Sequence, residues 1–214
     1  MPDGGVGDIT AWVRRAQLEA AAINDAVAQN AAMWEVVRLC VRAGDEESAR
    51  KIADLLAIRP HRFYFQELVA VERARKGDFA SAVKTAEAID SEQYRLDTLV
   101  QIIQAQGLAR DFAGATALAD KFDNAAWKAR AYGEIAAAQA LAGNFSAACE
   151  IANSEAISRQ PDKKEAARKR NELLSSIAEL QALAGDEHGA METAAEIGRG
   201  GKNEDPSQMA YRLQ

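Results

Sequence analysis

The sequence predicts an all-α fold: an α–α superhelix (solenoid) of about five antiparallel helix pairs plus a leading half-repeat, about 11 helices in all. Three observations lead to this prediction. A Gly-Asp pair or a near copy recurs, mostly with a period of 33 residues. Alanine stands at the fifth and the ninth position after the first residue of every pair. A β-branched residue stands eight positions before each pair.

The recurring columns are shared by five turns along the chain. The turns are Gly44-Asp45, Gly77-Asp78, Arg110-Asp111, Gly143-Asn144 and Gly185-Asp186. The alanines of the fifth position are Ala49, Ala82, Ala115, Ala148 and Ala190, and those of the ninth are Ala53, Ala86, Ala119, Ala152 and Ala194. The β-branched residues are Val36, Val69, Ile102, Ile135 and Ile177. Because the two alanines lie four residues apart, they share one helix face and let a neighbouring helix approach closely.

Each turn has the chemistry of one helix ending and another beginning. Glycine suits the position after a helix C-terminus, where a left-handed conformation is favoured. Aspartate and asparagine are preferred N-caps, because their side chains accept hydrogen bonds from the free amides of the first helical turn. We therefore expect helices near residues 8–23, 27–43, 45–57, 62–76, 78–89, 93–109, 111–122, 125–142, 144–157, 162–184 and 186–197.

The two ends of the array depart from the regular repeat. Residues 8–23 fit the frame as a leading half-repeat, with Asp8 as its expected cap. The last two turns are 42 residues apart instead of 33, and the nine extra residues lie around Ser158 to Arg170, where we expect a longer loop and a longer tenth helix. The twelfth position after each turn is bulky and apolar (Leu56, Ile89, Phe122 and Ile197) except at Glu155.

The predicted domain organisation is a flexible N-terminus (1–7), one repeat domain (8–198) and a flexible C-terminal tail (199–214). The tail is rich in glycine and polar residues at its start, which is typical of a linker. Its end carries Met209, Tyr211 and Leu213 at a spacing of two. The alternative to a flexible tail is that this apolar strip docks into a groove of its own chain or of a neighbouring molecule.

Composition narrows the possible functions. The 214 residues are 48% hydrophobic and 27% charged, with a net charge of −6, which argues against general nucleic-acid binding. Cys40 and Cys149 lack metal-ligand spacing and are expected to be small buried hydrophobes. His61 and His188 are expected at the surface. Without a signal peptide, a membrane-spanning run or a catalytic motif, the sequence predicts a cytoplasmic protein that is not an enzyme and needs no cofactor or metal.

The columns resemble those of tetratricopeptide repeats, a family of helical hairpins. The spacing from the turn glycine to the alanine of the second helix matches that family, and so do the small residues Ala70, Ala136 and Ala178 of the first helix. Departures are a period one residue short, alanine in place of the second-helix aromatic, and a general lack of the closing proline. The family's first-helix tyrosine is replaced in each repeat by Cys40, Arg73, Gln106, Gln139 or Gln181.

The resemblance implies that the first helices of successive pairs line a concave, partner-binding face. Mapped onto this chain, that face includes Trp34, Arg38, Arg42, Tyr64, Glu67, Arg75 and Gln104. Arginine holds carboxylates with a planar pair of donors, and aromatic anchors often carry much of an interface energy. The alternative is that Trp34 and Tyr64 pack between helices.

A basic segment falls inside the insertion and is the second candidate site. Its residues are Lys163, Lys164, Arg168, Lys169 and Arg170. It is either a docking patch for an acidic protein, an anionic lipid or nucleic acid, or the solvated face of a longer helix.

The sequence therefore predicts a scaffold or adaptor that binds a protein or peptide. The alternatives are a peptide or small-ligand sensor and, with less support, a helical repeat that reads nucleic acid. No membrane span is expected, and the oligomeric state stays open between a monomer and a weak homodimer.

Overall fold

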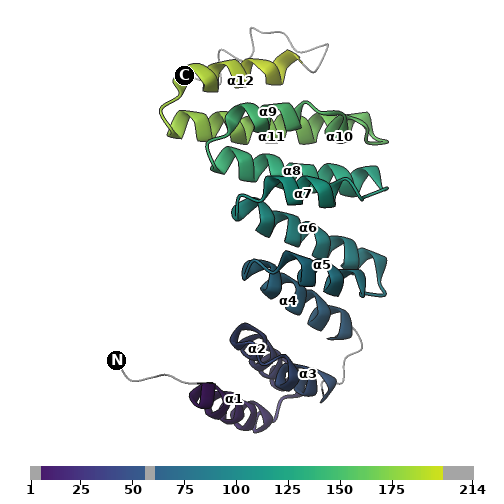
Figure 1. Ribbon diagram of the computed structural model, residues 1–214, viewed down its shortest axis with the longest axis vertical. Helices are drawn as coiled ribbons and strands as arrows, with labels where there is room; N and C mark the ends of the chain where they lie inside the picture. The colour runs from purple at the N-terminus through teal and green to yellow at the C-terminus, as the bar shows by residue number, and fades with distance from the viewer. Residues whose placement is uncertain (1–5, 56–60, 200–214) are drawn as a thin grey trace. The chain divides into compact units, whose positions relative to one another are not determined.

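A computed structural model describes residues 6–55 and 61–199 of the chain (Figure 1). Over these residues it contains eleven helices of eight or more residues, one helix of four residues and no strand, which confirms the all-α class. The helices are α1 (Val6–Ala21), α2 (Ala26–Ala43), α3 (Glu46–Leu55), α4 (His61–Arg75), α5 (Phe79–Glu87), α6 (Glu92–Leu108), α7 (Phe112–Ala119), α8 (Ala125–Leu141), α9 (Phe145–Ala152), α10 (Glu155–Ser158), α11 (Lys163–Leu183) and α12 (Glu187–Arg199).

Helices that follow one another across a turn pack as pairs. The pairs α2–α3, α4–α5, α8–α9 and α11–α12 each pack side by side. The chain divides into two compact units, one up to Thr98 and one from Leu99 onward, so that α6 contributes residues to both. In the second unit α11 packs against α8 and α9 as well as against α12, as the stacked green and yellow ribbons of Figure 1 show.

The turn glycines have the left-handed backbone that the sequence predicts. Gly44 has a φ of 86°, and Gly77, Gly143 and Gly185 each have a φ of 83°. At the first of these turns the backbone N–H of Gly44 donates to the carbonyl of Val41 at 3.0 Å. Arg110 occupies the same position in the remaining turn with a φ of 62°, a conformation that a residue with a Cβ adopts at a cost.

The predicted N-caps form at four of the five turns. The side chains of Asp45, Asp78, Asp111 and Asp186 accept hydrogen bonds from backbone amides three residues later, at 2.9 to 3.2 Å. Hydrogen bonding to Ser48 lowers the pKa of Asp45. Asn144 is the exception: its side chain makes no cap hydrogen bond, because its amide group donates to Gln139 Oε1 at 2.7 Å instead.

Glutamine side chains connect the end of a first helix to the cap of the next. Gln106 Nε2 donates to Asp111 Oδ2 at 3.0 Å, and Gln181 Nε2 donates to Asp186 Oδ2 at 3.4 Å. Gln181 also accepts a hydrogen bond from the hydroxyl of Thr193 at 2.7 Å. Each of these glutamines therefore forms a polar link between the end of one helix and the cap of the next.

The small-residue columns are buried, as expected. The alanines at the fifth and ninth positions of the first four repeats are buried, and Ala190 and Ala194 of α12 are half-buried. The β-branched residues are all buried. Gly107 on α6 lies so close to α8 that a Cβ placed on it would lie 2.6 Å from the Cβ of Ala138. Small residues at these positions therefore set how closely the helices pack.

The insertion before the last pair forms a short helix and lengthens the next one. The nine extra residues predicted there appear as the four-residue helix α10, a connecting segment and a longer first part of α11. Ile157 of α10 is fully buried, two residues after the exception at Glu155, and Ile89 and Phe122 of earlier repeats are buried as well. Asp162 caps α11 by accepting hydrogen bonds from the amides of Lys164 and Glu165.

Some boundaries differ from the prediction or fall outside it. Helix α1 begins at Val6, so Asp8 lies inside its first turn rather than before it. The expected end of the third helix at residue 57, the first five residues and the tail from residue 200 lie outside the described residues.

Candidate functional site: an aromatic row on the first unit

Four aromatic side chains from three first helices meet on the first unit. Trp34 of α2 contacts Tyr64 of α4 edge to face, with ring centroids 6.4 Å apart. Tyr64 contacts Tyr94, at the start of α6, in the same way at 5.2 Å. Phe63 stacks on Tyr94 at 5.7 Å. Trp34, Phe63, Tyr64 and Tyr94 are called the aromatic row below.

A hydrogen bond joins two members of the row. The hydroxyl of Tyr94 donates to the hydroxyl oxygen of Tyr64 at 3.0 Å. This hydrogen bond, together with desolvation and the nearby charges of Tyr64, Glu67 and Asp97, raises the pKa of Tyr94. Tyr64 is 40% exposed, so the row presents a tyrosine ring and its hydroxyl to solvent.

Trp34 and Tyr64 differ in how far they are buried. Trp34 is half-buried and packs against the core of the first unit, which includes Val37 and Val69. Tyr64, in contrast, is one of the exposed large side chains. Trp34 therefore supports the surface from beneath, while Tyr64 forms the part that a partner can reach.

Tyr94 and Phe63 are members of the row that the repeat columns do not reveal. Trp34, Tyr64 and Tyr94 follow one another at intervals of 30 residues, about one helical turn less than the repeat. Comparison at the 33-residue period therefore puts them in different columns. A search for aromatic residues offset by one turn per repeat would have found Tyr94.

The three arginines of the predicted face are engaged in ion pairs. Arg75 NH1 lies 2.6 Å from Oε1 of Glu72, and Nε of Arg42 lies 3.6 Å from the same oxygen. Glu72 is buried, with 7% of its surface exposed, whereas both arginines are more than half exposed. Arg38 pairs with Glu35 one turn away at 3.4 Å. Two guanidinium groups thus share one buried carboxylate.

The remaining predicted face residues lie on first helices as expected. Glu67 is half-buried on α4, in the same helix as Tyr64. Gln104 is exposed on α6, in the part of that helix that belongs to the second unit.

The predicted basic patch divides into engaged and exposed residues. Arg168 pairs with Glu165 at 2.6 Å and with Glu172 at 2.7 Å, and its hydrogen bond lowers the pKa of Glu165. Arg170 donates from Nε to Asn153 Oδ1 at 2.8 Å and from NH1 to the carbonyl of Glu196 at 3.3 Å, so it links α11 to α9 and α12.

Three lysines complete the segment. Lys163 and Lys164 are exposed at the start of α11, whereas Lys169 is half-buried with its side chain beside Gly133. Because Arg170 is used for packing and Arg168 is paired on both sides, the two exposed lysines are the part of the predicted patch most open to a partner.

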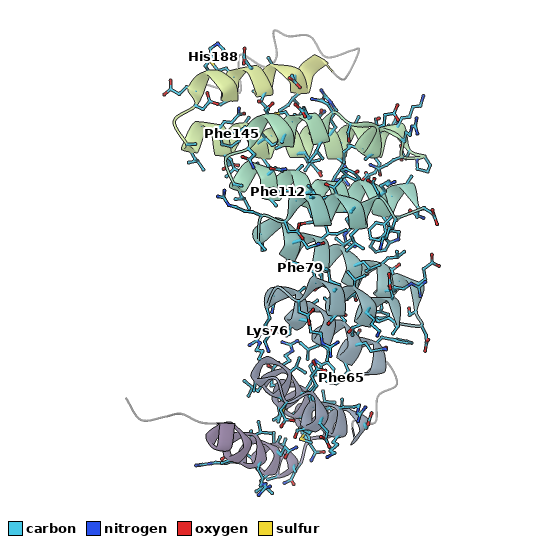
Figure 2. All side chains as sticks on the ribbon, in the orientation of Figure 1. Phe65, Lys76, Phe79, Phe112, Phe145 and His188 are labelled. Atoms are coloured by element: carbon cyan, nitrogen blue, oxygen red, sulfur yellow. The ribbon has the colours of Figure 1, made fainter. Side chains whose placement is uncertain are left out.

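The cysteines and His188 are placed largely as the sequence predicts. Cys40 is buried and Cys149 half-buried, both as free thiols, and burial raises the pKa of each. His188 is exposed at the start of α12, labelled in Figure 2, and its Nδ1 lies 3.6 Å from Glu192 Oε2. The side chain of His61 lies outside the described part of the structure.

The described residues contain neither a candidate metal site nor a candidate membrane-spanning helix. Among them, no group of three or more histidine, cysteine, aspartate or glutamate side chains could hold a metal ion. Within the same ranges, no helix has both the length and the apolar character needed to cross a membrane. Comparison of the chain with family models, curated proteins and solved structures finds no match.

Proposed function

We propose that this protein is a non-enzymatic helical-repeat scaffold or adaptor, similar to tetratricopeptide-repeat proteins, that binds a protein or peptide through its first unit. The observation that carries the proposal is the aromatic row with the exposed Tyr64, on the two helices α2 and α4 that also carry Arg38, Arg42 and Arg75. The proposal includes a cytoplasmic location, where reduced thiols such as the buried Cys40 persist.

The chemistry of this face suits an extended peptide. Tyrosine and tryptophan provide large, rigid contact areas, and they are enriched together with arginine where binding energy is concentrated. Tyr64 also offers a hydroxyl that already accepts a hydrogen bond from Tyr94 and can donate one to a partner. The guanidinium groups of Arg42 and Arg75 are planar and contact Glu72 through one nitrogen each, which leaves further N–H donors of both groups available for a carboxylate.

The proposal is tested by affinity capture from the native host, with captured proteins identified by mass spectrometry. Wild type is compared with Tyr64→Ala and Arg38→Glu, and with Arg50→Glu as a matched control on α3. A further variant is Arg42→Gln. Glutamine is chosen there because a glutamate would face the buried carboxylate of Glu72. Circular dichroism checks that every variant keeps its helical content.

We expect the same partner to be lost or strongly reduced with Tyr64→Ala and Arg38→Glu and kept with Arg50→Glu. If the partner is captured equally by all variants, this face is not the binding surface.

A further inference from the structure

The second unit contains a cleft of about 550 Å³ at the junction of two helix pairs. One wall is the end of α7 and the start of α8, and the other is α10 with its flanking residues. Its volume lies in the range of small-ligand sites, about 300–1,000 Å³. Its apolar lining comes from Phe122, Ala125 and Ala156.

The insertion builds the second wall of this cleft. α10 exists because of the extra residues between the last two turns, and Ile157 anchors it in the core. Anchoring Ile157 places Glu155 and Arg159 at the edge of the cleft, where they pair at 2.7 Å. Ser154, just before α10, also lines the cleft, and its hydroxyl oxygen is shielded from solvent without a hydrogen-bond partner among the described residues.

A linked group of side chains occupies the first wall. The hydroxyl of Tyr132 donates to Asp120 Oδ1 at 2.8 Å, and Lys128 Nζ donates to the backbone carbonyl of Asp120 at 3.1 Å. Lys128 Nζ also lies 3.6 Å from Asp120 Oδ1. Desolvation and the hydrogen bond to Asp120 raise the pKa of Tyr132 to about 12, so its hydroxyl keeps its proton at neutral pH.

The balance of charge in the cleft is negative. Its lining has the three carboxylates Asp120, Asp123 and Glu155 and two basic groups, each of which is paired with a carboxylate. Asp123 makes no hydrogen bond or ion pair with any other residue in the described part of the chain. The unused hydrogen-bonding capacity of the first wall therefore consists mainly of acceptors: the Asp123 carboxylate, the second oxygen of Asp120 and the lone pairs of Tyr132.

We propose that this cleft binds a primary ammonium or guanidinium group carried on a short apolar stem. Such a cation supplies several hydrogen-bond donors to Asp123, Asp120 and the Tyr132 oxygen, and its charge offsets the unpaired carboxylate. The stem lies against Phe122 and the two alanines. This proposal is independent of the aromatic row, which lies on the other unit.

The same chemistry has two sources, a free small amine and a lysine or arginine side chain of another protein. The full-length protein is titrated with n-butylamine and agmatine as free amines and with Nα-acetyl-lysine amide as a model of the protein side chain. Butyrate and n-butanol are the matched controls, because they keep the stem and change the charge. Binding is followed by amide chemical shifts in two-dimensional NMR spectra.

We expect the amines to shift amides of residues 120–125 and 154–159, whereas butyrate and butanol leave them unchanged. Asp123→Asn is expected to weaken amine binding about tenfold, since it removes a charge-assisted contact. Asp54→Asn, an exposed aspartate of the first unit, is the matched control and keeps full affinity.

Several outcomes overturn the proposal. Butyrate binding as well as butylamine would show that charge does not select the ligand. No shift at the cleft with any amine, or equal affinity in Asp123→Asn, would also refute it. A shift with Nα-acetyl-lysine amide but not with the free amines supports the protein side chain as the source, and the reverse result supports a free amine.

Discussion

Arg110 adopts a backbone conformation that the other four turns give to glycine. Its φ of 62° costs a residue with a Cβ about 1–2 kcal/mol. Glycine would remove this strain but would lose more conformational entropy on folding, which offsets part of the gain. Arg110→Gly is therefore expected to raise the free energy of unfolding by about 0.5–1 kcal/mol. Gly143→Ala, in the equivalent position, should lower it by a similar amount, and urea denaturation measures both. If the two substitutions change stability in the same direction, turn strain is not the cause.

Tyr132 is a residue whose ionisation reports on the amine cleft. Because its pKa is raised to about 12, the interaction with Asp120 stabilises the protein below the ordinary tyrosine pKa and is lost as the pH rises through the folded value. Ultraviolet titration of tyrosinate should therefore show one tyrosine ionising near pH 12. Tyr132→Phe should remove that step, whereas Tyr64→Phe should leave it in place.

At the scale of elements, the close packing of two helices depends on a glycine, which has no Cβ, at their contact. Alanine favours a helix over glycine by about 1 kcal/mol, yet we expect Gly107→Ala to destabilise the protein. The added Cβ would lie 2.6 Å from the Cβ of Ala138 and would force α6 and α8 apart. The pair Gly107→Ala with Ala138→Gly should recover part of the loss in urea denaturation. A stabilised Gly107→Ala would show that the contact can relax at no cost.

The short helix α10 depends on one buried side chain. Ile157 is fully buried, so Ile157→Ala should lower the free energy of unfolding by about 2–5 kcal/mol. The same change should weaken amine binding at the cleft, because Glu155 and Arg159 would lose their support. Calorimetry and the NMR titration check the two effects separately. Unchanged stability would show that α10 is not anchored by this residue.

The sequence predicts the helices well and the candidate site only in part, for a physical reason. Turn glycines, caps and alanine columns act within one or two helical turns, so their spacing in the sequence reflects their contacts. Side-chain pairing depends on neighbouring helices. Arg75 and Glu72 lie three residues apart on one helix, so their ion pair can be predicted, but nothing near Arg42 in the sequence shows that it reaches Glu72 of another helix. The repeat columns likewise do not predict that Ile157 is buried. In this repeat the twelfth position after the turn is Glu155, and the buried apolar residue comes two positions later, on a short helix.

At the scale of the whole molecule, the division into two units predicts separate local unfolding. In repeat proteins each element contacts mainly its neighbours, so a core defect acts locally. Ile52→Ala should speed amide hydrogen exchange in α2 and α3 and leave α9 and α11 unchanged, and Ile177→Ala should do the reverse. Hydrogen exchange with mass spectrometry measures both. Equal acceleration throughout the chain would show that the two units unfold together.

The insertion also shows where the molecule accepts new sequence. A junction between two helix pairs has taken in nine residues, while the buried position that closes the pair is still filled, by Ile157. These junctions are therefore the places to graft a reporter loop or a foreign epitope, provided that an isoleucine is supplied to fill the vacated core position. The turns within pairs offer no such freedom, because their left-handed residue and their cap are adjacent in the chain.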